Sequence, residues 1–144
     1  MRRTGRAAVL AALALGLALP GCGGEAGDIL FVKRTGSIPG AGLELRFTED
    51  GRVACNRGAL RQLTSAQTIE SRAIQGALAG KNDDGPATRH VSLPPGPGTI
   101  LRYQVRLQAG SVAFSDTSRG QPPAFFQTAQ LTRDVALGIC RLAR

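Results

Sequence analysis

The 144-residue sequence has no tryptophan, one histidine, one tyrosine and three cysteines. A zinc site is built largely from histidine and cysteine ligands, and these counts leave too few of them once the cysteines have other roles. Aromatic residues make up only 4% of the chain. This is too few for the interleaved basic and aromatic stripe of a nucleic-acid-binding surface. We therefore expect no metal, no cofactor and no nucleic-acid partner.

Long apolar runs are also scarce, and the longest lies at the N-terminus. Residues 7–20 are uncharged and rich in alanine and leucine, and they follow Arg2, Arg3 and Arg6. The run is shorter than the roughly 20 apolar residues that span a bilayer core. A basic start followed by a short apolar run is typical of a secretory signal peptide. We assign this signal peptide to residues 1–21.

Cys22 follows directly, in the segment Leu19-Pro20-Gly21-Cys22, which resembles a bacterial lipobox. In a lipobox the cysteine thiol receives diacylglycerol, and cleavage then makes that cysteine the new N-terminus. The resemblance implies acylation of Cys22, with chains such as palmitate that each contribute about 0.8 kcal/mol per buried methylene. Residues 22–27 would then be a short tether to the membrane. Ordinary cleavage after Ala26, which would remove Cys22, is the alternative.

Two further cysteines, Cys55 and Cys140, remain in the exported part of the chain. Disulfides persist in exported proteins, and an even number of cysteines favours pairing. We predict a Cys55–Cys140 disulfide, which would contribute about 4 to 5 kcal/mol in the chain-entropy model because it closes a long loop. A pair of free buried thiols is the alternative.

Basic residues outnumber acidic ones throughout the chain. Removal of three arginines with residues 1–21 leaves fifteen Lys and Arg against ten Asp and Glu, a net charge of +5. These basic residues are scattered, with no run of four. The charge therefore indicates at most attraction to an anionic envelope surface. Residues 28–144 are the right length for a single domain with its own core.

The first half of this domain has the pattern of antiparallel strands. Residues 28–34, 43–49 and 52–56 have strand character. Asp50-Gly51 is a hairpin signal between the second and third of them. The first two are joined by a loop rich in glycine and proline. This loop comprises Ser37, Ile38, Pro39, Gly40, Ala41 and Gly42.

At residue 64 the spacing of apolar residues changes from that of a strand to that of a helix. Thr64 and Gln67 form a capping box, which predicts a helix that starts there and closes at Gly80. We expect its buried face to carry Ile69, Ala73, Ala77 and Leu78.

The second half predicts a hairpin over residues 99–116 and a final helix that starts at Pro122-Pro123. The helical spacing places Cys140 on the face of this helix that points toward the sheet. Positions on the same face are Phe125, Ala129, Thr132, Ala136 and Ile139. The order of strands, helix, hairpin and C-terminal helix predicts an α+β fold, a small antiparallel sheet with two packed helices.

Residues 81–98 form the longest irregular stretch, which is typical of a functional or mobile loop. Its segment LPPGPG suits either a polyproline II ligand or a stiff connector. The same stretch contains His90 and Asp83-Asp84. A Cys55–His90 nucleophile pair would need Cys55 to be free, and adjacent acids in KNDDG are typical of a solvated turn. We therefore expect no catalytic site and no enzyme.

Several short motifs occur in order along residues 29–140 and together resemble known families. They are Arg34-Thr35-Gly36 and Gly40 in the first loop, Asp50-Gly51, Leu63, Tyr103 and Pro122-Pro123. This pattern resembles a group of small uncharacterised lipoproteins of high-GC bacteria. More distantly, it is similar to emfourin-type inhibitors of thermolysin-like metallopeptidases. The resemblance implies an exported α+β domain that binds a protein, with a surface metallopeptidase as one such partner.

We therefore expect a lipid-anchored, non-enzymatic envelope protein on the extracytoplasmic side of the membrane, whose domain binds another protein. The loop 37–42 is the predicted partner-binding loop, because a rigid loop between two strands loses little entropy on entering a cleft. The same loop serving only as a connector is the structural alternative. The alternative function is a module that binds envelope polymers through its basic charge, and such binding would weaken strongly with modest salt.

Overall fold

The computed structural model of the protein describes residues 26–142. The predicted signal peptide, the predicted lipidation site Cys22 and most of the predicted tether lie outside the described residues. The elements in chain order are β1 (Asp28–Gly36), β2 (Leu43–Thr48), β3 (Arg52–Cys55), β4 (Leu60–Gln62), α1 (Ser65–Ala79), β5 (Leu101–Leu107), β6 (Gly110–Ser115) and α2 (Pro123–Gly138).

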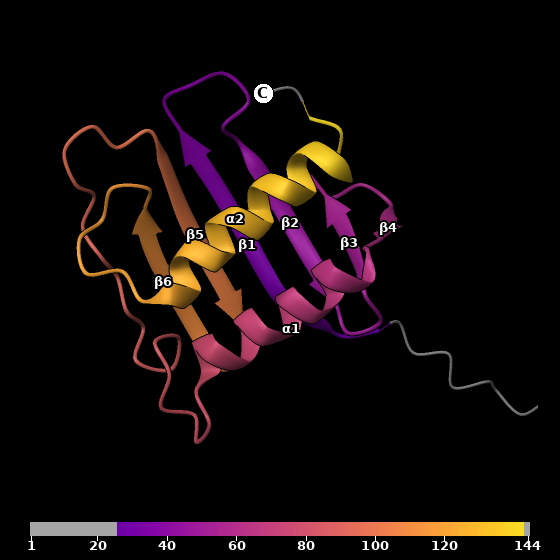
Figure 1. Ribbon diagram of the computed structural model, residues 1–144, viewed down its shortest axis with the longest axis horizontal. Helices are drawn as coiled ribbons and strands as arrows, with labels where there is room; N and C mark the ends of the chain where they lie inside the picture. The colour runs from indigo at the N-terminus through magenta and orange to yellow at the C-terminus, as the bar shows by residue number, and fades with distance from the viewer. Residues whose placement is uncertain (1–25, 143–144) are drawn as a thin grey trace, which may run out of the picture.

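The strands form one six-stranded antiparallel sheet in the order β4-β3-β2-β1-β5-β6 (Figure 1). β1 lies in the interior and pairs with β2 on one side and with β5 on the other, so it joins the N-terminal strands to the later hairpin. Both helices lie across the same face of the sheet (Figure 1). The predicted α+β fold is confirmed.

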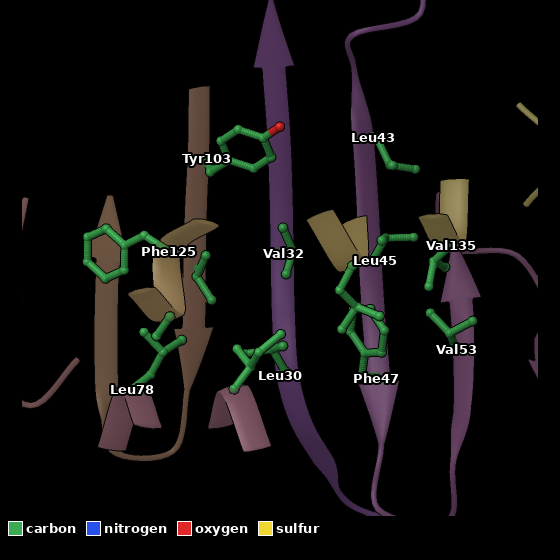
Figure 2. Close-up of a cluster of buried hydrophobic side chains, with 14 of the residues drawn as sticks. Leu30, Val32, Leu43, Leu45, Phe47, Val53, Leu78, Tyr103, Phe125 and Val135 are labelled. Carbon is green, nitrogen blue, oxygen red and sulfur yellow. The ribbon is translucent and has the colours of Figure 1, made fainter. Parts of the chain in front are cut away.

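The core lies between this face and the two helices (Figure 2). Alternate residues of a strand point to opposite faces, so every second side chain of the long strands enters the core. The largest fully buried side chains include Leu30, Val32, Leu45, Phe47, Val53, Ile74, Leu78, Val105, Phe125, Leu131 and Val135.

The turn between β2 and β3 forms at the predicted Asp50-Gly51 signal. Gly51 has φ +77°, a value that glycine adopts without a steric penalty, and its N–H donates to the Thr48 carbonyl at 3.1 Å. The Arg52 and Thr48 side chains each donate a hydrogen bond that lowers the pKa of the Asp50 carboxyl, and the bond from Arg52 has the larger effect. The contacts of this carboxylate are therefore present at neutral pH and are lost as the pH falls through its lowered pKa.

Helix α1 begins at the predicted capping box. The Gln67 N–H donates to Thr64 Oγ1 at 3.2 Å, and the Thr64 N–H donates to Gln67 Oε1 at 3.1 Å. Two backbone N–H groups that a helix start leaves unpaired thus find partners. At the other end, Gly80 takes a positive φ of +80° and donates its N–H to the Gly76 carbonyl at 2.9 Å.

The buried face of α1 includes Leu78, as predicted, but not the other three predicted residues. Ser71, Ile74 and Leu78 face the core, whereas Ile69 is 69% exposed. Ala73 and Ala77 are exposed as well. The helix is rich in small residues, so its sequence contains two overlapping apolar stripes. The stripe that packs on the sheet is the one that contains both Ile74 and Leu78, two large side chains four residues apart.

Helix α2 has proline at its start, as predicted, and it ends at Gly138. Its buried face includes Phe125, Thr132 and Ala136 of the predicted set, and Ala129 and Ile139 are half-buried. Two buried threonines on this face donate hydrogen bonds from their hydroxyl groups to backbone carbonyls of the same helix, four residues earlier. Thr128 Oγ1 donates to the Ala124 carbonyl and Thr132 Oγ1 to the Thr128 carbonyl, both at 2.7 Å. No buried hydroxyl on this face is therefore left without a partner in the described part of the chain.

The predicted disulfide is present. Cys55 at the end of β3 is bonded to Cys140, two residues beyond α2, with their Cα atoms 5.9 Å apart. Next to it, Arg61 on β4 donates to the Ile139 carbonyl at 2.7 Å. These two links fix the end of α2 to the β3–β4 side of the sheet.

The long segment 81–98 packs along the opposite edge of the sheet. The Leu93 N–H donates to the Ala113 carbonyl at 2.9 Å, and the Ala113 N–H donates to the Val91 carbonyl at 3.0 Å. Ser118 Oγ also donates to the Pro94 carbonyl at 2.9 Å. The segment therefore pairs with β6, whose edge would otherwise present unpaired backbone groups. Of the two readings of LPPGPG, these contacts favour the connector.

Candidate functional site

The predicted partner-binding loop, residues 37–42, turns sharply between β1 and β2. The Ala41 N–H donates to the Ile38 carbonyl at 3.2 Å, which closes a four-residue turn. Pro39 occupies the second position of this turn, and Gly40, with φ +75°, occupies the third. Proline followed by a residue with positive φ is the signature of a type II turn. The sequence of the loop therefore determines the shape of its tip.

The side chain of Arg34 on β1 donates hydrogen bonds to two backbone carbonyls of this turn. Its Nε donates to the Ala41 carbonyl at 2.9 Å, and its Nη2 donates to the Gly40 carbonyl at 3.1 Å. On the other side, the Ser37 N–H donates to the Ile100 carbonyl at 3.1 Å. At Gly36 a side chain would collide with that same carbonyl, so the backbones can approach this closely only at a glycine. The loop is thus rigid before it meets any partner.

The turn presents one large apolar side chain at its tip. Ile38 is 49% exposed, whereas Ala41 is buried. An apolar hollow of about 420 Å³ lies between the turn and α2. It is lined by Arg34, Ile38, Pro39, Gly40, Ala41, Leu101, Arg133, Ala136 and Leu137.

A second hollow of about 420 Å³ continues along α2 and shares Arg34, Leu101 and Arg133 with the first. Its lining also includes Tyr103 from β5 and Phe126 from α2. We call the two hollows together the α2 groove. Leu137 and Phe126, which are 38% and 58% exposed, line its two parts. The groove therefore places Leu137 beside the turn and Phe126 farther along α2.

The groove also carries polar groups. The guanidinium groups of Arg34 and Arg133 line both of its parts, and Asp116 lines the second. Burial raises the pKa of the Tyr103 phenol, and the nearby charge of Arg34 opposes this rise. The phenol therefore stays protonated at neutral pH and remains a hydrogen-bond donor. An apolar groove with a few polar groups is suited to binding a side chain or a peptide segment.

The residues considered for catalysis do not come together. Cys55 is bonded to Cys140, so it has no thiol to act as a nucleophile. His90 lies in the segment that follows α1, with Nδ1 3.4 Å from Ser111 Oγ. Asp83 and Asp84 are exposed. Within residues 26–142, no group of three histidine, cysteine or acidic side chains is placed to hold a metal ion.

The sequence identified one wall of the groove and missed the other. The turn was recognisable because Pro39-Gly40 is a strong local signal. Phe126 and Leu137 were missed because they occupy positions of α2 next to those predicted to be buried. Their size was the available signal, but single apolar side chains on the outward side of a helix are common and do not by themselves mark a site.

Neither helix in the described part of the chain is long and apolar enough to cross a bilayer. No protein-family model, no curated protein and no solved structure matches this chain.

Proposed function

We propose that this protein is a lipid-anchored, non-enzymatic envelope protein whose α+β domain binds another protein through the 37–42 turn and the α2 groove. One observation carries the proposal: an isoleucine is exposed at the tip of a turn that three side-chain and backbone hydrogen bonds from Arg34 and Ser37 hold in place. The lipid anchor, acylation of Cys22, is proposed from the N-terminal sequence.

A rigid turn favours protein binding for an entropic reason. A flexible loop loses conformational entropy when a partner orders it, and this loss subtracts from the binding free energy. The hydrogen bonds of Arg34 remove much of that loss in advance. Burial of an exposed apolar side chain such as Ile38 would then contribute about 1.5 to 3 kcal/mol to binding. The turn and the groove together suit an extended segment of a partner protein.

Inhibition of a surface metallopeptidase is a narrower form of this proposal. It is proposed from the resemblance of the short sequence motifs to those of emfourin-type inhibitors and from the turn, which exposes one apolar side chain, Ile38. Such an inhibitor would present Ile38 to the cleft of a thermolysin-like enzyme. Titration of the activity of such an enzyme with this protein distinguishes an inhibitor from a binder of another class.

The test of the binding site is an Ile38→Asp variant. The mature protein is immobilised, exposed to envelope extract at low and moderate salt, and the captured proteins are identified and quantified. We expect one stoichiometric partner that survives moderate salt. Its affinity for Ile38→Asp should fall at least about tenfold, because the apolar contact of Ile38 is lost and a charged carboxylate is desolvated where the partner buried an apolar side chain.

The matched control is Ile69→Asp, the same substitution at an isoleucine that is 69% exposed on α1. We expect this variant to capture the partner as well as the wild type does. Equal capture by all three proteins would show that the turn is not the binding site. Capture that is heterogeneous and disappears with salt would indicate association driven by charge, and would contradict a specific protein interface.

The proposed anchor is tested by a Cys22→Ala variant expressed in the producing bacterium. Without the thiol there is no site for acylation, so we expect the protein to move from the membrane fraction to the soluble fraction. A domain held by acyl chains needs them for stable attachment. If the variant still fractionates with membranes, the lipoprotein assignment is wrong.

A further inference from the structure

The second face of the sheet carries no helix in the part of the chain that the structure describes (Figure 1). Residues of β1, β2, β3 and β5 and of the turn that follows β3 surround a depression of about 590 Å³ on this face. We call this depression the basic dish. Its charged lining consists of Lys33, Arg46, Arg57, Arg106 and a single acid, Glu44. The dish thus has a net charge of +3, a large part of the +5 of residues 22–144.

Two of these cations form no ion pair with any acidic residue that the structure describes, whereas the other two do. Arg57 pairs with Glu44 at 3.2 Å, and Arg46 pairs with Asp28 at 3.2 Å. Among the described residues, neither Lys33 nor Arg106 forms an ion pair. Their charges are therefore available to an anionic ligand.

Phe31 lies between the arginines of the dish. In the sheet register it is opposite Arg46 on β2 and opposite Arg106 on β5. The Arg106 guanidinium carbon lies 4.5 Å from the centre of the Phe31 ring, at cation–π distance. This contact holds the guanidinium in place, so less side-chain entropy is lost when it binds an anion.

The dimensions of the dish suit an elongated ligand with several charges. Arg46 and Arg106 are two strands apart, which separates their backbones by about 10 Å. Lys33 is two residues from Phe31 along β1, about 7 Å further along the sheet. Each of the three arginines offers paired N–H donors to phosphate oxygens, and Lys33 adds a compact positive charge. A chain with regularly spaced phosphates meets several of these donors at once.

The dish also selects against other polyanions. Its one aromatic ring, Phe31, has the Arg106 guanidinium over one face, so that face does not stack on a nucleobase or a sugar ring. Its concave shape leaves a gap against a flat bilayer. Gln104 and Glu44 in the lining can instead hydrogen-bond to hydroxyl groups.

We propose that the basic dish binds a linear phosphodiester polymer of the cell envelope whose repeating units are small polyols. The phosphates contact Lys33, Arg46 and Arg106, and the hydroxyl groups between them contact Gln104. This site is on the face opposite the helices, whereas the α2 groove lies beside α2. The polymer and a protein partner therefore do not compete for the same surface.

The test uses end-labelled poly(glycerol phosphate) and the mature protein at about 0.15 M salt, with binding followed by fluorescence polarisation. The variant Lys33→Gln/Arg106→Gln removes the two unpaired cations of the dish. We expect its affinity to be at least about tenfold lower, because two charge-assisted hydrogen bonds are lost. Thermal unfolding of both proteins checks that the variant is folded.

The control variant Lys81→Gln/Arg119→Gln removes the same two residue types from exposed loops that do not line the dish. It should bind the polymer within about twofold of the wild type, since distant exposed charges are screened. An equal loss in both variants, or no binding by the wild type, would overturn the proposal. Ile38→Asp should bind the polymer as well as the wild type does. A wrong assignment of the basic dish can therefore be distinguished from a wrong assignment of the α2 groove.

Three competitor probes complete the test. These are single-stranded DNA, poly-glutamate and vesicles of anionic phospholipid. We expect each to bind at least about tenfold more weakly than poly(glycerol phosphate), a difference of about 1.4 kcal/mol. Equal or tighter binding of any of them would overturn the identification of the ligand as a phosphate and polyol polymer.

Discussion

Replacement of both Cys55 and Cys140 by serine is expected to lower the free energy of unfolding by about 4 to 5 kcal/mol. The disulfide joins residues that are 85 positions apart, so without it the unfolded chain gains much conformational entropy. The folded state also loses the link between the end of α2 and β3. Urea unfolding of the two proteins, followed by circular dichroism, measures the difference.

The wild-type protein treated with a reductant provides the control. Its unfolding curve should coincide with that of the double serine variant, since both lack the same bond. A loss below about 1 kcal/mol in the variant would contradict the account, because it would show that the link restricts the unfolded chain very little. Disagreement between the reduced wild type and the variant would instead show that serine itself disturbs the site.

A Phe125→Ala substitution is expected to destabilise the domain by about 3 to 5 kcal/mol, since it removes a large buried side chain and leaves a cavity. Phe125 is 0% exposed. Its ring stacks on Phe114 with centroids 4.6 Å apart, and Phe114 stacks on Tyr103 at 5.0 Å. The stacking of these three rings packs the start of α2 against β5 and β6. Thermal and urea unfolding measure the loss.

The neighbouring Phe126 is a matched control for this prediction. It is 58% exposed and lines the α2 groove. Phe126→Ala should change the free energy of unfolding by no more than about 0.5 kcal/mol. If the groove binds a protein, the same variant should weaken capture of the partner. A large destabilisation by Phe126→Ala, or none by Phe125→Ala, would contradict the packing of α2 described above.

Local signals predicted most of the fold. The capping box at Thr64 and the Asp50-Gly51 turn depend on residues close in the sequence, and both are confirmed. The three residues of β4 were not predicted, because Leu60–Gln62 is too short to show an alternating pattern. The face of α1 was predicted correctly at Leu78 and wrongly at Ile69, Ala73 and Ala77, because the small residues of this helix distinguish poorly between two apolar stripes.

The two candidate surfaces were harder to predict because tertiary structure assembles them. The turn at Pro39-Gly40 was visible in the sequence, but its position beside Leu137 depends on how α2 crosses the sheet. In the basic dish, Phe31, Arg46 and Arg106 are far apart in the chain and meet only through the strand register. The sequence therefore showed an excess of basic charge without showing where that charge gathers.

The central claim is that a partner protein contacts the tip of the 37–42 turn. The most direct test is to place a photo-cross-linking amino acid at position 38 in the producing cell, with position 69 as the control. We expect one discrete adduct with an envelope protein at position 38 and none at position 69. No adduct at position 38, or the same set of adducts at both positions, would contradict the claim.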